Sequence, residues 1–166
     1  MKTLTKLMLG LGLTVSATVN AAGLAVVDLA KVVESSTYLK QQNASLSQSV
    51  KPTSTRLEQL GKELESLQQK AQTEGQKMNQ ADIQKLTAQY QSKLSEFNST
   101  QQGLQTKVQS SLQAMNTTFE TRVKQAAEQL RKENNLDFIL NKNSTIASDA
   151  QYDLTDKMIQ KVNSIK

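Results

Sequence analysis

Residues 57–71 of the chain read LEQLGKELESLQQKA, a stretch in which single apolar residues recur among polar ones. The apolar positions are separated by steps of three, four, three and four residues: Leu57, Leu60, Leu64, Leu67 and Ala71. This is the heptad spacing of a left-handed coiled coil, in which one narrow apolar seam meets a partner helix. The rest of such a helix faces water. The stretch therefore predicts a long helix that pairs along a seam and builds no compact core by itself.

A second helical stretch follows at residues 104–130. Its apolar positions step by 4, 4, 3, 4, 4, 3 and 4 residues: Leu104, Val108, Leu112, Met115, Phe119, Val123, Ala126 and Leu130. This eleven-residue repeat favours a straight or slightly right-handed superhelix, so we expect the two helices to pair imperfectly. Between them, Gly75 can end one helix and Asn79 can cap the next. We predict a helical hairpin arm over residues 37–134, with its tip near residues 75–79.

Pro52 lies inside the outgoing helix of this arm. A proline in a helix interior removes one hydrogen bond and clashes with the preceding turn, at a cost of about 3 kcal/mol. Thr55 and Glu58 have the spacing of a capping box, which can restart a helix. We therefore expect a kink or a short break at residues 49–53.

Both ends of the chain carry short strand patterns. Residues 24–27 form an apolar run, and Asp28 can cap a short helix after it. Residues 137–140 and 144–147 read as a second and a third strand on either side of a polar turn. Asp153 can cap a closing amphipathic helix.

These ends, residues 22–36 and 135–166, predict a small β-rich head. The expected fold class is α+β and mostly α, with a long antiparallel helical hairpin projecting from that head. Three short strands from one chain make a poor sheet alone, so we expect several copies to complete it. The candidate residues for the core of the head and its oligomer are Val26, Val27, Phe138, Ile139, Leu140, Ile146, Leu154 and Ile159.

Residues 1–21 have the features of a secretory signal peptide. Lys2 and Lys6 give a positive start, and an apolar stretch over residues 7–15 follows. That stretch is shorter than the roughly 20 residues that span a bilayer. Small residues precede a cleavage position between Ala21 and Ala22. We expect export as a soluble protein to the periplasm, with secretion to the medium as the alternative.

The composition excludes several kinds of chemistry. The chain has no cysteine and no histidine, which argues against thiol or Ser-His catalysis and against an ordinary zinc site. It has no glycine-rich phosphate-binding motif, so nucleotide-driven action is not expected. Asp149, Asp153 and Asp156 lack the glycine and glutamate of a calcium loop and read as turn and cap residues. We therefore expect no enzyme activity, no metal and no cofactor.

The formal net charge is +5, which can attract acidic partners over a Debye length of about 10 Å. Basic residues near the end of the second helix could bind a polyanion, but glutamates are interleaved with them and no aromatic residue is placed to stack on a base. The candidate contacts of the arm with a bound protein are Met78, Tyr90, Phe97, Met115 and Phe119. Packing in the seam is the competing role for most of these five.

The two ends of the chain resemble the Skp/OmpH family of periplasmic chaperones. Ala25-Val26-Val27-Asp28 with its short helix is similar to the family's first strand and helix. Asn135-Leu136-Asp137-Phe138-Ile139-Leu140, followed by a polar turn and Asp153-Leu154-Thr155, is similar to its closing segment. The likeness lies in the order and spacing of these short motifs over the mature chain. Pro52 and the glutamine-rich arm depart from the family's pattern.

The resemblance implies a homotrimer in which three hairpin arms surround a cavity. Unfolded outer-membrane β-barrel proteins would be held there without ATP during their transit to the outer membrane. Two alternatives remain open from the residues themselves. One is a structural or scaffolding coiled-coil protein of the envelope. The other is a basic protein that binds lipopolysaccharide or contacts a membrane surface, whereas nucleic acid is disfavoured by the export signal.

Overall fold

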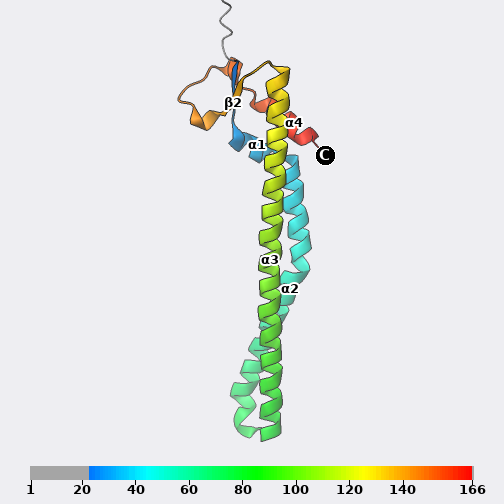
Figure 1. The fold of residues 1–166 in the computed structure, drawn as a ribbon. Helices are drawn as coiled ribbons and strands as arrows, with labels where there is room; N and C mark the ends of the chain where they lie inside the picture. The colour runs from blue at the N-terminus through cyan, green and yellow to red at the C-terminus, as the bar shows by residue number, and fades with distance from the viewer. Residues whose placement is uncertain (1–22, 166) are drawn as a thin grey trace, which may run out of the picture.

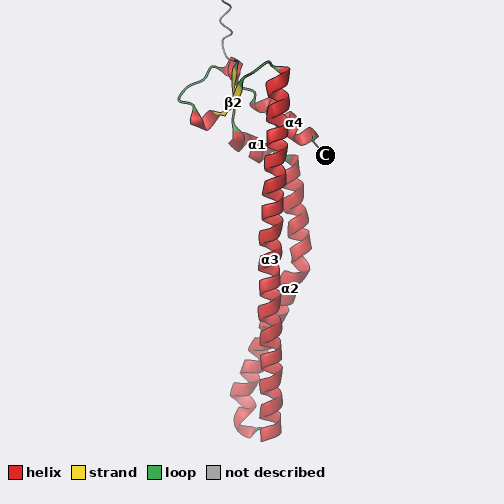
Figure 2. Ribbon diagram, viewed as in Figure 1, coloured by secondary structure: helices red, strands yellow, loops and turns green. Residues whose placement is uncertain are grey.

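A computed structural model describes residues 23–165. The expected signal peptide and its cleavage position lie outside these residues. Figures 1 and 2 show a long two-helix arm with a small head at one end, where the two described ends of the chain meet. This arrangement confirms the expected fold class. Among the described residues, no helix is both long enough and apolar enough to cross a membrane.

The arm consists of α2 (Thr37–Glu74) and α3 (Gln80–Glu133), joined by a short 3₁₀ helix, η1 (Gly75–Lys77). The tip therefore lies where the sequence predicts it. Asn79 caps α3 by accepting a hydrogen bond from the Asp82 backbone N–H at 2.9 Å. Because α3 has 54 residues and α2 has 38, the far end of α3 continues into the head.

Of the kink or short break expected at residues 49–53, the break does not occur, because α2 is helical from one end to the other. No new helix starts at Thr55. Figure 1 shows instead that α2 bends partway along the arm while α3 stays nearly straight. Lys107 Nζ of α3 donates a hydrogen bond to the Ser49 carbonyl at 3.1 Å. Pairing with α3 offsets the cost of keeping Pro52 in the helix.

The sheet of the head has two parallel strands, β1 (Leu24–Val27) and β2 (Phe138–Asn141), with Leu24 opposite Phe138 and Val27 opposite Asn141. Parallel strands need a long crossover connection, and the whole arm is that connection. The Gly23 carbonyl accepts hydrogen bonds from the backbone of Asp137 and Phe138.

The turn between α3 and β2 brings the backbone close to Gly23. Asn135 has a positive φ of 51°, and the Leu136 N–H returns to the Arg131 carbonyl at 2.9 Å. These features form the Schellman ending of a helix, in which Asn tolerates the left-handed position. A Cβ on Gly23 would lie 2.7 Å from the Asn135 carbonyl oxygen. Only glycine allows this approach without a shift of the backbone.

The third strand predicted at residues 144–147 is wrong. Residues 142–144 form the 3₁₀ helix η2 (Lys142–Ser144), and the Lys142 carbonyl accepts from the Thr145 N–H and hydroxyl. The chain then passes through a second 3₁₀ helix, η3 (Ala150–Tyr152). The Val26 carbonyl accepts from the Leu154 N–H at 2.9 Å, so an isolated bridge takes the place of the expected strand.

The core of the head joins four elements. The short helix α1 (Leu29–Ser35) and the closing helix α4 (Thr155–Ser164) pack against the end of α3 and against β1. The fully buried cluster consists of Val27, Val32, Ala126, Leu130, Met158 and Val162. Leu29, Phe119, Val123, Ala127, Ile139, Leu154, Ile159 and Ile165 surround it. This cluster fixes the angle at which the arm leaves the head.

Hydrogen bonds from α4 hold the junction between α1 and α2. Ser36 is buried and caps α2 by accepting from the Leu39 N–H at 3.2 Å. Asn163 of α4 accepts from both the N–H and the hydroxyl of Thr37 and donates to the Ser35 carbonyl. The arm is therefore attached to the head by specific polar contacts as well as by the core.

Asp153 supplies a pH-dependent contribution to the stability of the head. Hydrogen bonds from Lys142 and then from Thr155 hold the pKa of Asp153 at about 2. The Asp153 side chain is 23% exposed, so solvent screens the pair only in part. Because the folded pKa lies below the unfolded one, this contribution is complete above about pH 4 and is lost as the pH falls toward 2.

We expect Asp153→Asn to lower the free energy of unfolding by about 1–2 kcal/mol at neutral pH and to flatten its decline between pH 4 and 2. Urea unfolding across this pH range measures both effects. Asp156→Asn, on an exposed position of α4, is the matched control and should keep the steeper decline. An equally flat pH profile for the control would contradict the assignment to Asp153.

Candidate functional site

The arm is held together by a thin seam. Between residues 37 and 125, only Leu60 and Met115 are buried. The other seam residues are half-buried or exposed, and glutamine, serine, lysine and glutamate cover the rest of both helices. The arm therefore presents most of its surface to its surroundings, and that surface is the first candidate site.

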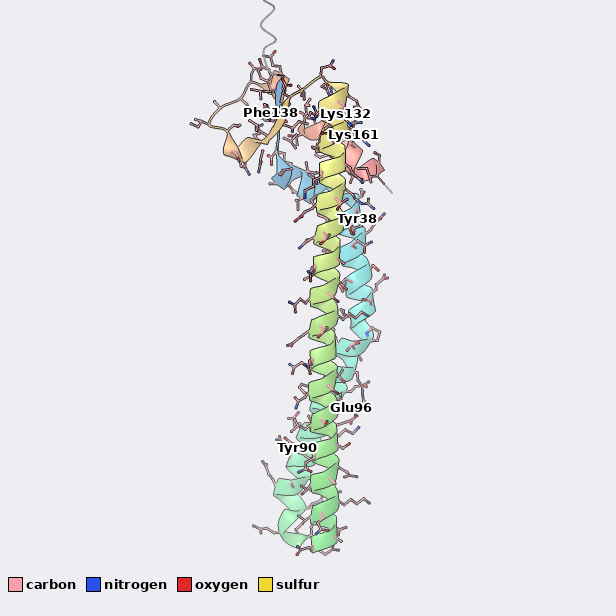
Figure 3. All side chains as sticks on the ribbon, in the orientation of Figure 1. Tyr38, Tyr90, Glu96, Lys132, Phe138 and Lys161 are labelled. Carbon is pink, nitrogen blue, oxygen red and sulfur yellow. The ribbon has the colours of Figure 1, made fainter. Side chains whose placement is uncertain are left out.

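Four charged residues connect α2 and α3 beside Leu60, and we call them the ionic clamp: Arg56, Glu63, Lys93 and Glu96. Arg56 donates to Glu96 at 2.5 and 2.9 Å, and Lys93 lies 2.6 Å from Glu63. The hydrogen bond to Glu96 raises the pKa of Arg56, and the one from Lys93 lowers the pKa of Glu63. Figure 3 shows Glu96 on the lower half of the arm. The clamp lies on the head side of the tip.

Beyond the clamp, the two helices enclose a groove of about 430 Å³ on one side, which we call the tip groove. Its lining residues are Leu67, Gln68, Ala71, Gly75, Met78, Ile83, Leu86, Thr87 and Tyr90. None of these side chains is Lys, Arg, Asp or Glu. Gln68 Nε2 donates to the Tyr90 hydroxyl at 3.0 Å, across the two helices. The groove is thus apolar with a small polar edge.

Two other hollows at the tip have the opposite character. One, of about 820 Å³, is lined by Lys62, Glu63, Ser66, Leu67, Lys85, Ala88, Gln89, Ser92 and Lys93. The other, of about 520 Å³, is lined by Lys70, Glu74, Lys77, Met78, Asp82, Lys85, Leu86 and Gln89. Lysine outnumbers acidic residues in both linings. The end of the arm therefore has one uncharged groove and two mainly basic hollows.

The five predicted contact residues fall in different places along the arm. Met78 and Tyr90 are half-buried and line the tip groove. Phe97 is half-buried on α3. Met115 is buried in the seam, and Phe119 packs against the core cluster of the head. The structure thus brings two of the five together, and contact of any of them with a bound protein stays a prediction.

The head exposes a group of large apolar side chains, which we call the exposed head face: Leu24, Phe138, Leu140, Ile146 and Tyr152. Phe138 is 58% exposed and Ile146 is fully exposed. Figure 3 shows Phe138 beside the two-stranded sheet of the head. Leu24, Leu140 and Tyr152 line a hollow of about 450 Å³ there. Exposed apolar groups of this kind are typical of an interaction surface.

The predicted head residues divide between the interior and this face. Val26 and Val27 are buried within one chain, and Ile139, Leu154 and Ile159 are partly buried. The other three belong to the exposed head face. Leu24 and Tyr152 were not among the predicted head residues, although Leu24 begins the predicted strand at residues 24–27 and Tyr152 directly precedes the predicted cap Asp153. Whether these residues join two copies stays a prediction.

Among residues 23–165, no group of three or more acidic, cysteine or histidine side chains is placed to hold a metal ion. In the arm, Glu96 and Glu63 form salt bridges with Arg56 and Lys93. In the head, Asp153 forms one with Lys142.

Two comparisons with known proteins give a match. Residues 23–162 match the model of the family described as outer membrane protein (OmpH-like). The fold is similar to a solved structure from Caulobacter crescentus CB15, a candidate outer membrane chaperone (OmpH-like), with a TM-score of 0.74 and 15% sequence identity. That alignment covers 87% of this chain and 85% of the other. A search of the curated proteins finds no match.

Proposed function

Since this chain belongs to the OmpH-like family, we propose that it is a periplasmic holdase chaperone that binds unfolded outer-membrane β-barrel proteins and prevents their aggregation. Its action would need no ATP, because many weak contacts would hold the client and the client's own folding would compete for its release. The observation that carries this proposal is the arm: two long helices whose thin seam leaves a polar surface with several hollows beside it.

The oligomer that we propose is a homotrimer, as the resemblance to the Skp/OmpH family implies. The exposed head face supports self-association, because a two-stranded sheet is small for one chain and its Phe138 and Leu140 side chains are exposed, as is Ile146 in the loop that follows. Three arms from one body would surround a shared space, and each client segment would meet several arms. Many weak contacts can then retain a client without trapping one conformation.

The arm carries more lysine and arginine than aspartate and glutamate, so an acidic client is attracted to it. A periplasmic location fits the expected signal peptide over residues 1–21. A structural role in the envelope would instead need one defined partner, and a lipopolysaccharide-binding role would need a polyanion.

The proposal is tested by light scattering of a denatured porin diluted into buffer with and without the purified protein. At stoichiometric amounts of oligomer we expect scattering to stay near the level of buffer alone. Native mass measured in parallel gives the oligomer number. Unchanged aggregation at several-fold excess would reject the holdase role. If the protein binds lipopolysaccharide tightly, and if added lipopolysaccharide restores porin aggregation, a lipopolysaccharide-binding function is favoured instead.

Client binding should weaken as the salt concentration rises. The charges of the arm are exposed, and the Debye length falls from about 10 Å at 0.1 M to about 3 Å at 1 M ionic strength. We expect the Kd for an acidic unfolded porin to rise at least several-fold between these two conditions. Fluorescence titration of a labelled porin measures it. A salt-independent Kd would assign client binding to apolar contacts alone.

A further inference from the structure

The tip groove is open because small residues interrupt the seam. The apolar heptad of α2 ends at Ala71, where a larger side chain would fill the space between the helices. At Gly75 an added Cβ would meet no atom within 4 Å. The ionic clamp connects the helices on the head side of the groove, and η1 connects them at the tip. The tip groove therefore lies between two places where the helices are connected, the ionic clamp and η1.

The groove lacks charge in a region that is otherwise rich in it. Lys70, Lys77 and Lys85 line the neighbouring hollow, while all nine residues of the groove are uncharged. A charged side chain placed in the groove would lose water without gaining an ionic partner, which is costly. An anionic lipid surface would instead be attracted to the lysines of the neighbouring hollow. The groove therefore selects for an uncharged apolar group.

The size of the tip groove and its polar edge further restrict which chemical group can bind there. About 430 Å³ lies near the lower end of ligand pockets, which span roughly 300–1,000 Å³, and suits one large side chain with a little backbone. The Tyr90 hydroxyl accepts from Gln68, and a hydroxyl that accepts still has a proton to donate. That proton can reach a backbone carbonyl beside the bound side chain. Met78 in the lining can adapt its shape to an aromatic ring.

We propose that the tip groove captures one uncharged aromatic or large aliphatic side chain of an extended protein segment. This inference rests on the proposed function and names the part of the client that the tip recognises. The ring occupies the space left by Ala71 and Gly75, between Leu67 and Leu86. The Tyr90 hydroxyl donates to the adjacent backbone carbonyl of the client. One such contact is weak, so the client is held at several arms and exchanges among them.

The test uses methionine methyl resonances of the purified oligomer. Met78 lines the groove, whereas Met115 and Met158 are buried in the seam and the head and serve as internal references. The probe is the blocked uncharged peptide Ser-Gly-Trp-Gly-Ser. We expect the Met78 methyl to shift saturably on titration, because an aromatic ring against it changes its magnetic environment. The two reference methyls should stay in place.

Ala71→Leu fills the groove and should weaken peptide binding at least about tenfold, while the arm stays folded or gains stability. Ala88→Leu is the matched control, because it is the same substitution in the basic hollow and should change the Kd less than about twofold. Ile83→Ser removes an exposed part of the groove wall and should also weaken binding, which tests the groove even if Ala71→Leu misfolds.

Three outcomes would overturn the inference. The first is a Met78 methyl that does not shift when the peptide is added, and the second is equal peptide affinity of Ala71→Leu and Ala88→Leu. The third is a Met78 shift without peptide, produced by raising the protein concentration or by adding phosphatidylglycerol vesicles. The last would identify a second copy or a bilayer as the occupant. The porin assay separates this inference from the proposed function. Suppression of aggregation with an unresponsive Met78 rejects the groove alone, and a responsive Met78 without suppression rejects the holdase role alone.

Discussion

The double substitution Phe138→Asp and Ile146→Asp is expected to convert the proposed homotrimer into single chains in native mass spectrometry. Burying each of these side chains is worth about 1.5–3 kcal/mol, and a carboxylate buried without a partner costs several kcal/mol more. Both positions are repeated in every copy, so the losses accumulate over the interface. We expect the dissociation constant to rise more than about a hundredfold.

The substitution should leave the single chain folded. Ile146 is fully exposed and lies in the loop between η2 and η3, and the Phe138 side chain points away from the buried cluster. Suppression of porin aggregation should fall with the oligomer, because isolated arms cannot surround a client. Leu112→Asp is the control: Leu112 is also an exposed apolar residue but lies on α3, and its substitution should leave the mass unchanged. Persistence of the oligomer in the double variant would exclude the exposed head face as its interface.

The arm could be predicted from the sequence because its signals are local. The spacing of Leu57, Leu60 and Leu64 predicts a helix with one seam, and Gly75 with Asn79 predicts the tip. All of these act within a few residues of the chain, and the structure confirms the hairpin and its turn. The Schellman ending at Asn135 is also a local feature, yet a single Asn-Asn pair does not specify a positive φ.

The wrong expectations depended on contacts distant in sequence. A short break, one of the two outcomes expected at Pro52, follows from helix energetics alone, but α2 pairs with α3 along the arm and stays helical through Pro52. A third strand at residues 144–147 follows from composition, but β1 pairs with β2 on one side and bonds to Leu154 on the other. Sequence patterns do not say which edge of a strand is already occupied.

The candidate site shows the same limit. Met78 and Met115 are both candidate contacts from the sequence, although Met115 lies on the apolar repeat of residues 104–130 and Met78 lies in the predicted tip. The pairing of α2 with α3 places Met115 in the buried seam and Met78 in the lining of the tip groove. The groove itself arises where Ala71 of one helix faces Ile83 and Leu86 across the turn. Such a space is visible only when both helices are in place.

The second large effect is expected from Leu130→Ala, which should lower the free energy of unfolding by about 2–5 kcal/mol. Leu130 is 1% exposed and lies in the buried cluster that joins α3 to β1, α1 and α4. Removing it leaves a cavity where these four elements meet. Since a domain of this kind is stable by only about 5–15 kcal/mol, the loss is a large part of the total.

Urea unfolding followed by circular dichroism, at one fixed protein concentration, measures this loss. Leu112→Ala on the same helix is the matched control, because Leu112 is 39% exposed and should cost less than about 1 kcal/mol. Hydrogen exchange adds a local readout: amides of β1 and α4 should lose protection in Leu130→Ala, because the cluster holds both against α3. Equal costs for Leu130→Ala and Leu112→Ala would mean that the head does not depend on this cluster, and that the arm is fixed to it by the polar contacts of Asn163 instead.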